Sequence, residues 1–213
     1  MTGLTMHEGT VAPSGDWPAD AVAYADREWT GYSLGEVPAL IVRDGMIHWG
    51  DTHVPMPDGQ SDDTVALACL LAVAHDAVSA LGSAKSVTVT GGGVVAWLVR
   101  RICSGSATPP GSRPDAVVDT TGDASVLVES SHSPCDGGTL VLAGESLGRA
   151  CTINLYTDVH RRGLTLVGVR PPLAGGSLEP HLSEAIHLRR EQPPRAVTFG
   201  ARLGEATWYR FAR

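Results

Sequence analysis

Lysine is almost absent from this 213-residue sequence, which contains Lys85 and no other. The 16 basic residues are outnumbered by 23 acidic ones, and the formal net charge is −7. The arginine pairs Arg100–Arg101, Arg161–Arg162 and Arg189–Arg190 are short and far apart in the chain. Affinity for nucleic acids comes mostly from clustered lysine and arginine, so this charge distribution argues against a nucleic-acid partner. We interpret the pairs as helix ends or solvated surface.

Long apolar runs are also missing. No segment approaches the roughly 18 apolar residues that span a bilayer. The start, MTGLTMHEGT, has neither the basic region nor the apolar core of a signal peptide. We therefore expect a cytoplasmic protein that does not act at a membrane. The four cysteines form no CxxC pair, and we expect them to be free thiols: Cys69, Cys103, Cys135 and Cys151.

The length, with a hydrophobic content of 43%, is sufficient for one main folded domain. Up to about residue 59 the chain is rich in Gly, Pro and Asp, and the clearest signal is a hairpin around Asp44–Gly45. The stretch 61–81 then begins with a Ser/Asp cap and continues apolar and Ala-rich. It predicts a largely buried helix that ends at Gly82.

Apolar strands alternate with helices in the rest of the chain. A β-branched run at 86–90 leads into three glycines and a helix through Ile102, and the Pro-rich stretch 104–114 cannot continue that helix. This alternation indicates an α/β fold with a Rossmann-like parallel sheet covered by helices on both faces. The remaining expected elements are strands at 115–122, 138–144, 164–169 and 196–201, a helix or loop at 124–133, and a helix at 183–191.

Five stretches follow one another in an order typical of one enzyme family. They are MPDGQSDDTVALACLLAVAHDAV, VTVTGGGVVAWL, DAVVDTTG, CDGGTLVLAGE and INLYTDVHRRGLTLVG, with LGEA (203–206) near the end. Together they resemble the zinc-type medium-chain alcohol dehydrogenase superfamily, in particular its polyol and threonine dehydrogenase branch. The resemblance covers most of residues 55–206 and implies a Rossmann-type cofactor domain.

The zinc site of that family has no clear counterpart. The family holds its catalytic zinc in a separate N-terminal domain through a cysteine, a His-Glu pair and a further acid. The motif HEG at 7–9 is similar to part of this set, but no cysteine precedes it, and Cys69 stands where the family has the further acid. The resemblance implies that 1–60 are a reduced remnant of the metal-binding domain and that 61–213 form a truncated Rossmann-like domain with a C-terminal return element. We expect no zinc.

The glycine run matches the dinucleotide-binding fingerprint. Gly91, Gly93 and Ala96 stand where G-x-G-x-x-G/A falls. A second strand ending in a ribose-binding acid should follow about 20 residues on, but 104–114 contains no strand pattern. On one interpretation 115–119 is this strand, and Asp119 binds the ribose. On the other, which the resemblance favours, DAVVDTTG is the family's fourth strand, and the second and third strands have been lost.

The favoured interpretation makes two predictions. Strand 86–90 should lie directly beside strand 116–119, and nothing should pair with its other side except the N-terminal segment. Half of the adenosine pocket would be missing, so NAD(P) should bind weakly or not at all. The residues expected at a cofactor site are Gly91, Gly92, Gly93, Ala96, Asp119, Thr121, Gly122 and Gly144.

Other polar residues have simpler interpretations. His160 lies in a connection before a strand, and His75 and Asp76 are neighbours on one helix, so we favour structural roles for them. The run SHS at 131–133, taken with Asp119, suggests a hydrolase, but the sequence has no G-x-S-x-G nucleophile elbow.

Three functions remain open. We favour an auxiliary or binding protein in a specialised biosynthetic pathway. The alternatives are a zinc-independent NAD(P)-dependent oxidoreductase and a cofactor-free enzyme that reuses the cleft of the dehydrogenase fold. In the family, the last strand of the cofactor domain pairs with its copy in a second subunit. The runs 164–169 and 196–201 are apolar and carry no lysine or glutamate, so we expect a homodimer or a heteromer with a full-length dehydrogenase.

Overall fold

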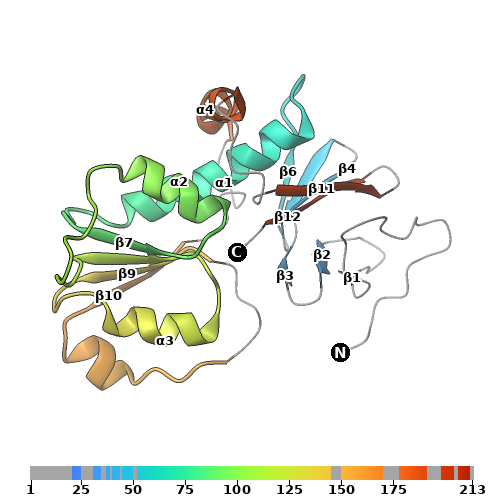
Figure 1. The fold of residues 1–213 in the computed structure, drawn as a ribbon. Helices are drawn as coiled ribbons and strands as arrows, with labels where there is room; N and C mark the ends of the chain where they lie inside the picture. The colour runs from blue at the N-terminus through green and yellow to red at the C-terminus, as the bar shows by residue number, and fades with distance from the viewer. Residues whose placement is uncertain are drawn as a thin grey trace. The chain divides into compact units, whose positions relative to one another are not determined.

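The computed structural model describes residues 21–24, 31–34, 37–38, 40–43, 45–49, 52–144, 150–169, 178–190, 198–203 and 206–211. The chain divides into two compact units. The first consists of Met1–Cys69 and Pro171–Ala212, and the second of Leu70–Arg170 with Arg213. Figure 1 labels most elements of the two units and colours the chain from its N-terminus to its C-terminus.

The first unit contains two antiparallel sheets. One has the order β1-β2-β3 and the other the order β11-β12-β4-β5-β6. β4 pairs with β5 across Gly45, whose φ of 71° suits a tight turn, so the hairpin predicted at Asp44–Gly45 is confirmed. The bounds are Ala21–Tyr24 (β1), Gly31–Leu34 (β2), Val37–Pro38 (β3), Leu40–Arg43 (β4), Met46–Trp49 (β5), Thr52–Pro55 (β6), Thr198–Leu203 (β11) and Ala206–Phe211 (β12).

The described part of the run 196–201, which lies in β11, does not join the parallel sheet, contrary to the sequence-based expectation. β11 pairs antiparallel with β12, and β12 pairs antiparallel with β4. Apolar runs of this length occur in both kinds of sheet, so the run alone does not specify its partner. Antiparallel strands can be joined by a two-residue connection, and β12 follows β11 after two residues.

Two helices also contribute to the first unit. α1 (Asp62–Ser79) confirms the helix predicted at 61–81, and its first eight residues belong to this unit. The hydroxyl of Ser61 accepts a hydrogen bond from the N–H of Thr64, at 3.4 Å, as an N-cap does. Arg189 of α4 (Glu179–Arg190) donates to the hydroxyls of Ser61 and Thr64, at 2.6 and 2.8 Å. The end of α4 is thereby fixed to the start of α1.

The second unit is built on a four-stranded parallel sheet of order β10-β9-β8-β7. Its strands are β7 (Val87–Thr90), β8 (Ala116–Asp119), β9 (Thr139–Leu142) and β10 (Thr165–Gly168), and every neighbouring pair is parallel. All four residues of β8 are buried, because this strand lies between β7 and β9 and its first three residues are apolar. The prediction that 86–90 lies directly beside 116–119 is confirmed.

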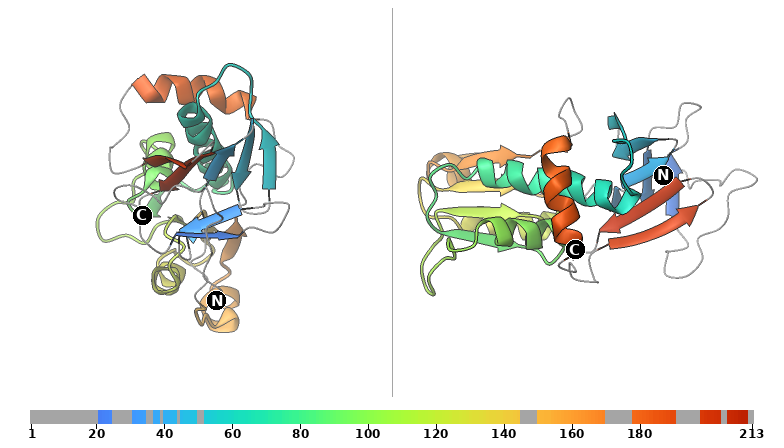
Figure 2. Two further views of the ribbon diagram at one scale, coloured as in Figure 1. Left: turned by 90° about the vertical axis from the view of Figure 1, so that its right-hand side faces the viewer. Right: turned by 90° about the horizontal axis from the view of Figure 1, so that it is seen from above.

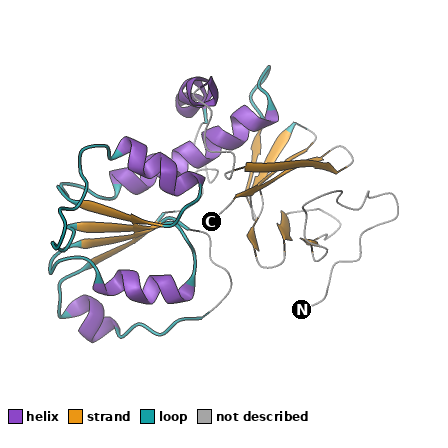
Figure 3. Ribbon diagram, in the orientation of Figure 1, coloured by secondary structure: helices purple, strands orange, loops and turns teal. Residues whose placement is uncertain are grey.

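Helices cover both faces of this sheet, as predicted. α2 (Val94–Ile102) lies on the same face as the C-terminal part of α1, whereas α3 (Ala124–His132) and the short π-helix η1 (Leu155–His160) lie on the opposite face (Figures 1 and 3). Seen from above, α1 and α2 stand in front of the strands (Figure 2, right). The second unit is therefore a three-layer α/β domain.

One prediction about the free side of β7 is wrong. A single parallel bridge joins Val87 to Ala107, and the N–H of Val87 donates to the carbonyl of Ser106 at 2.7 Å. The hydroxyls of Thr88 and Thr108 are also 2.9 Å apart. The chain after α2 thus touches the outer edge of β7 before it returns to β8. An exposed strand edge has polar groups that need partners, and this segment supplies some of them.

The positions of α2 and α3 on opposite faces of the parallel sheet explain what the segment 106–108 contributes to the fold. All four strands are parallel and follow one direction across the sheet, so a simple β7-α2-β8 crossover would be left-handed if β8-α3-β9 is right-handed. About 98% of such crossovers are right-handed. With residues 106–108 beside β7, the unit β7-α2-(106–108) is right-handed, and the chain then crosses back to β8. β7 is therefore the strand at which the direction of the chain reverses.

Candidate functional site

The carboxyl ends of β7, β8 and β9 are packed against one another, and they carry most of the residues predicted for a cofactor site. Gly91 has a φ of 106°, and a Cβ there would overlap the hydroxyl of Thr120. A Cβ on Gly144 would lie 2.7 Å from the N–H nitrogen of Thr121 and closer still to that of Gly122. Glycine is required at both positions because no side chain fits between these turns.

The glycine turn leads directly into α2. Gly93 is the N-cap residue in extended conformation, without a side-chain cap, and α2 begins at Val94. Ala96 is fully buried, where a larger side chain would push the helix away from the sheet. A glycine turn followed by a helix N-terminus is the geometry that binds a pyrophosphate in dinucleotide-binding folds. Gly92, between the two structural glycines, is exposed.

Asp119 at the end of β8 is directed into the protein. The residue is 3% exposed. Its Oδ1 accepts hydrogen bonds from the N–H of Thr121 at 2.8 Å and from the hydroxyl of Thr121 at 2.7 Å. The hydroxyl of Thr90 is 3.5 Å away. The carboxylate therefore shapes the turn after β8, in the manner of an Asx-turn.

Arg100 is a feature of this edge that the sequence did not reveal. Its Nη2 donates to the carbonyl of Val89 at 2.8 Å and to the carbonyl of Gly91 at 2.6 Å. The guanidinium thus lies on the outer edge of β7, next to the glycine turn. The neighbouring Arg101 points elsewhere and lies over the ring of Trp97, at 5.8 Å from the centroid. From the sequence alone, two adjacent arginines at a helix end do not indicate that their side chains have different partners.

The described residues offer few side chains that could act as ligands to a metal ion. Across the described ranges, no group of three or more His, Cys, Asp or Glu side chains is arranged to hold a metal ion. Cys69 is completely buried in α1, and burial raises the pKa of its thiol to about 12. A metal binds the thiolate, so this residue is a poor ligand. The motif at 7–9 lies outside the described residues.

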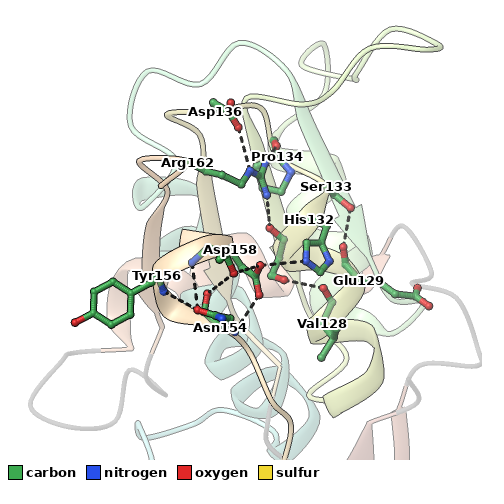
Figure 4. Close-up of polar contacts among 12 residues, drawn as sticks. Val128, Glu129, His132, Ser133, Pro134, Asp136, Asn154, Tyr156, Asp158 and Arg162 are labelled. Carbon is green, nitrogen blue, oxygen red and sulfur yellow. Dashed lines mark hydrogen bonds and ion pairs between the residues drawn. The ribbon is translucent and has the colours of Figure 1, made fainter. Parts of the chain in front are cut away.

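The hydrolase candidates have separate partners. The hydroxyl of Ser131 donates to the carbonyl of Val128 in its own helix at 2.7 Å. Nε2 of His132 faces Oδ1 of Asp158, on η1, at 3.6 Å (Figure 4). Asp119 bonds to threonines, as described above. Ser131 therefore does not bond to His132, and Asp119 is not the acid beside that histidine, as a catalytic triad would require.

The TDVHRRG stretch forms the contact between η1 and α3. Arg162 donates to Asp136 at 3.0 Å, to the carbonyl of Ser131 at 2.8 Å and to the carbonyl of Pro134 (Figure 4). A hydrogen bond from the Thr157 hydroxyl, then one from the N–H of Asn154, lower the pKa of Asp158, with a smaller effect of His132. His160 is exposed, with its ring edge-on to Tyr156 at 6.1 Å.

Strand order, parallel register and the glycine turn make the second unit a Rossmann-like α/β domain. No protein-family model matches the sequence, and no curated protein matches it. Among solved structures, the chain is similar to a Sinorhizobium meliloti protein described as a zinc-binding dehydrogenase and bound to NADP, with 18% identity, a TM-score of 0.48, and coverage of 68% of this chain and 55% of that one.

Two further structures are similar at the same level. One is 2R,3R-butanediol dehydrogenase from Bacillus subtilis, with 17% identity, a TM-score of 0.46, and coverage of 70% of this chain and 53% of that one. The other is L-idonate 5-dehydrogenase from Escherichia coli, with 15% identity, a TM-score of 0.42, and coverage of 66% and 50%. The chain thus spans about half the length of these enzymes. The likeness concerns the fold and assigns no activity.

No helix among the described residues is long and apolar enough to cross a membrane.

Proposed function

We propose that this chain is a dehydrogenase-like protein without catalytic zinc, which acts as an auxiliary or binding protein in a specialised biosynthetic pathway beside a full-length dehydrogenase. The observation that carries the proposal is the state of the nucleotide site. The glycine turn and the helix after it are present, but the strand that should supply the ribose-binding acid is represented by one bridge, Val87 to Ala107.

The crossover geometry supports the loss of two strands. In a dinucleotide-binding fold the second strand lies on the outer side of the first, and the fourth lies on its inner side. Residues 106–108 are on the outer side of β7, and β8 is on the inner side. We infer from this that β8 corresponds to a fourth strand, and that the chain between 108 and 115 stands for everything between the second strand and the fourth.

A weakened nucleotide site follows from this arrangement. Backbone N–H groups at the start of α2 remain for a pyrophosphate. The carboxylate of Asp119 is buried and bonded to Thr121, so it does not substitute for a ribose-binding acid. We infer that NAD(P) binds weakly and that hydride transfer, which needs the cofactor held in place, is not the main activity.

The sheet edge at β10 supports a partner. Leu166, in the middle of this strand, is 43% exposed, and Leu155 and Tyr156 on the adjoining η1 are exposed as well. An apolar strand edge with exposed leucine is an aggregation hazard unless something pairs with it or covers it. A second copy of this chain, or the matching edge of a full-length dehydrogenase, would pair with it and bury these side chains.

Co-expression with a full-length dehydrogenase from the same pathway tests this proposal. Co-purification, together with a change in the partner's turnover, is the expected result, and Leu166→Glu should abolish both. Thr165→Glu, at a neighbouring position of the same strand, is a control for charge on that strand. Failure to co-purify and an unchanged turnover would refute the auxiliary role.

A second candidate, a zinc-independent NAD(P)-dependent oxidoreductase, is favoured by the intact glycine turn. A ligand that binds only the folded state at a concentration equal to its Kd stabilises it by about 0.4 kcal/mol. We expect no more than this at millimolar NADPH. A shift of the melting temperature by many degrees at micromolar NADPH, abolished by Gly93→Val, would make the oxidoreductase the better conclusion.

A further inference from the structure

The outer edge of β7 presents a defined set of polar groups. In a parallel strand, successive residues direct their N–H and C=O groups to opposite sides. The carbonyls of Ser86 and Thr90 accept from the N–H groups at the start of β8 and just after its end. The groups of the odd-numbered residues, Val87, Val89 and Gly91, therefore face the outer edge. These are the groups that a second strand would engage.

Three of these outer-edge groups have partners from the chain itself. The N–H of Val87 donates to the carbonyl of Ser106. The carbonyls of Val89 and Gly91 both accept from Nη2 of Arg100. One guanidinium nitrogen thus occupies two successive acceptors that the amides of an added strand would otherwise use.

We propose that Arg100 and residues 106–108 form an edge cap that takes the place of a second strand and closes this side of the sheet to strand addition by another copy of the chain. The two components of the edge cap engage different parts of β7. Residues 106–108 engage its amino-terminal part through Val87 and Thr88, and Arg100 engages its carboxyl-terminal part. A charged side chain on an edge is a known means of preventing edge-to-edge association.

The edge cap makes the β7 edge of the sheet less able than the opposite edge to pair with an added strand. An added strand would have to displace two charge-assisted hydrogen bonds and bring its own backbone against a guanidinium. Association of this protein through β-strand pairing is therefore directed away from β7. This inference does not depend on the proposed function, because it concerns only the hydrogen bonds of the β7 edge.

Arg100→Met tests the edge cap, since it removes the donors and the charge while keeping an apolar stem. Arg101→Met is the matched control, with the same change one residue along the helix. Light scattering of Arg100→Met should show at least a doubling of the mean mass relative to wild type, as expected when a further edge pairs with its copy. Hydrogen exchange in residues 86–92 should become slower on association. Arg101→Met should match the wild type in both measurements.

Two further variants provide a rescue and a guard against misfolding. Arg100→Lys keeps a cationic N–H donor on a side chain of nearly the same length, so its mass should stay close to that of the wild type. Thr108→Val removes the hydroxyl pair with Thr88 and leaves α2 unchanged, and it should raise the mass by a smaller factor. The edge cap is refuted if folded Arg100→Met has the wild-type mass. It is also refuted if Arg100→Met associates without protection of 86–92, or if Arg101→Met associates equally. Should Arg100→Met fail to fold, an unchanged mass for Thr108→Val refutes it.

Discussion

Replacement of Asp119 distinguishes a structural carboxylate from a cofactor-binding one. In the folded chain this side chain is almost fully buried, and it accepts two short hydrogen bonds from Thr121. A hydrogen bond to a charged group contributes about 1.5–3 kcal/mol to stability, and a buried donor left without a partner adds a further cost. Asp119→Ala should therefore lower the free energy of unfolding by about 3–5 kcal/mol. Asp119→Asn keeps an acceptor oxygen and should cost about 1–2 kcal/mol.

Urea unfolding followed by circular dichroism measures this effect. With a slope of about 2 kcal/mol per molar urea, Asp119→Ala should move the midpoint by roughly 2 M. The affinity for NADPH, measured by calorimetry on the folded variants, should stay unchanged for Asp119→Asn. The opposite pattern would refute the reasoning: a midpoint like that of the wild type, combined with a tenfold loss of NADPH affinity, would make Asp119 the ribose ligand and β8 a second strand.

Three other predictions concern metal, pH and assembly. Elemental analysis of purified protein should find no stoichiometric zinc, and Cys69→Ser should not change the result; one zinc per chain, lost in this variant, would contradict the expectation. The lowered pKa of Asp158 means that its ionised form stabilises the fold above pH 3.8, its ordinary value, and that this contribution disappears as the pH falls through the lowered pKa. Asp158→Asn should therefore be less stable than wild type near neutral pH and equal to it in strong acid; a difference that grows on acidification would exclude this cause. Light scattering of the wild type should give more than 22.2 kDa, the mass of one chain, at micromolar concentration, and Leu166→Glu should bring the mass down to that value.

The second unit was largely predictable because its signals are local. Continuous apolar runs gave β7 to β10, and the Ser/Asp cap before an Ala-rich stretch gave α1. The pairing of β7 with β8 followed from the resemblance, because the motif at 115–122 matches a fourth strand. The hairpin at Gly45 was visible for the same local reason, a turn signal between two apolar runs.

The features that escaped prediction depend on which backbone groups lack a partner. Nothing in the Arg100–Arg101 pair shows that one side chain bends back to two carbonyls while the other lies over Trp97. The bridge at Ala107 involves one residue, too short for any periodic pattern. The partner of β11 was missed because an apolar run does not encode whether its neighbour is parallel or antiparallel.

The path of the chain around β7 also defines where the protein could be enlarged. Val87 is flanked by Ala107 on one side and Ala116 on the other, so the chain leaves and rejoins the sheet at points about 10 Å apart, two strand spacings. Residues 109–113 between them are all exposed. Surface segments with neighbouring ends accept long insertions at small entropic cost. Once Arg100 is moved off the carbonyls of Val89 and Gly91, a strand-helix-strand module grafted at this one position would extend the sheet outward from β7 without altering β8, β9 or β10.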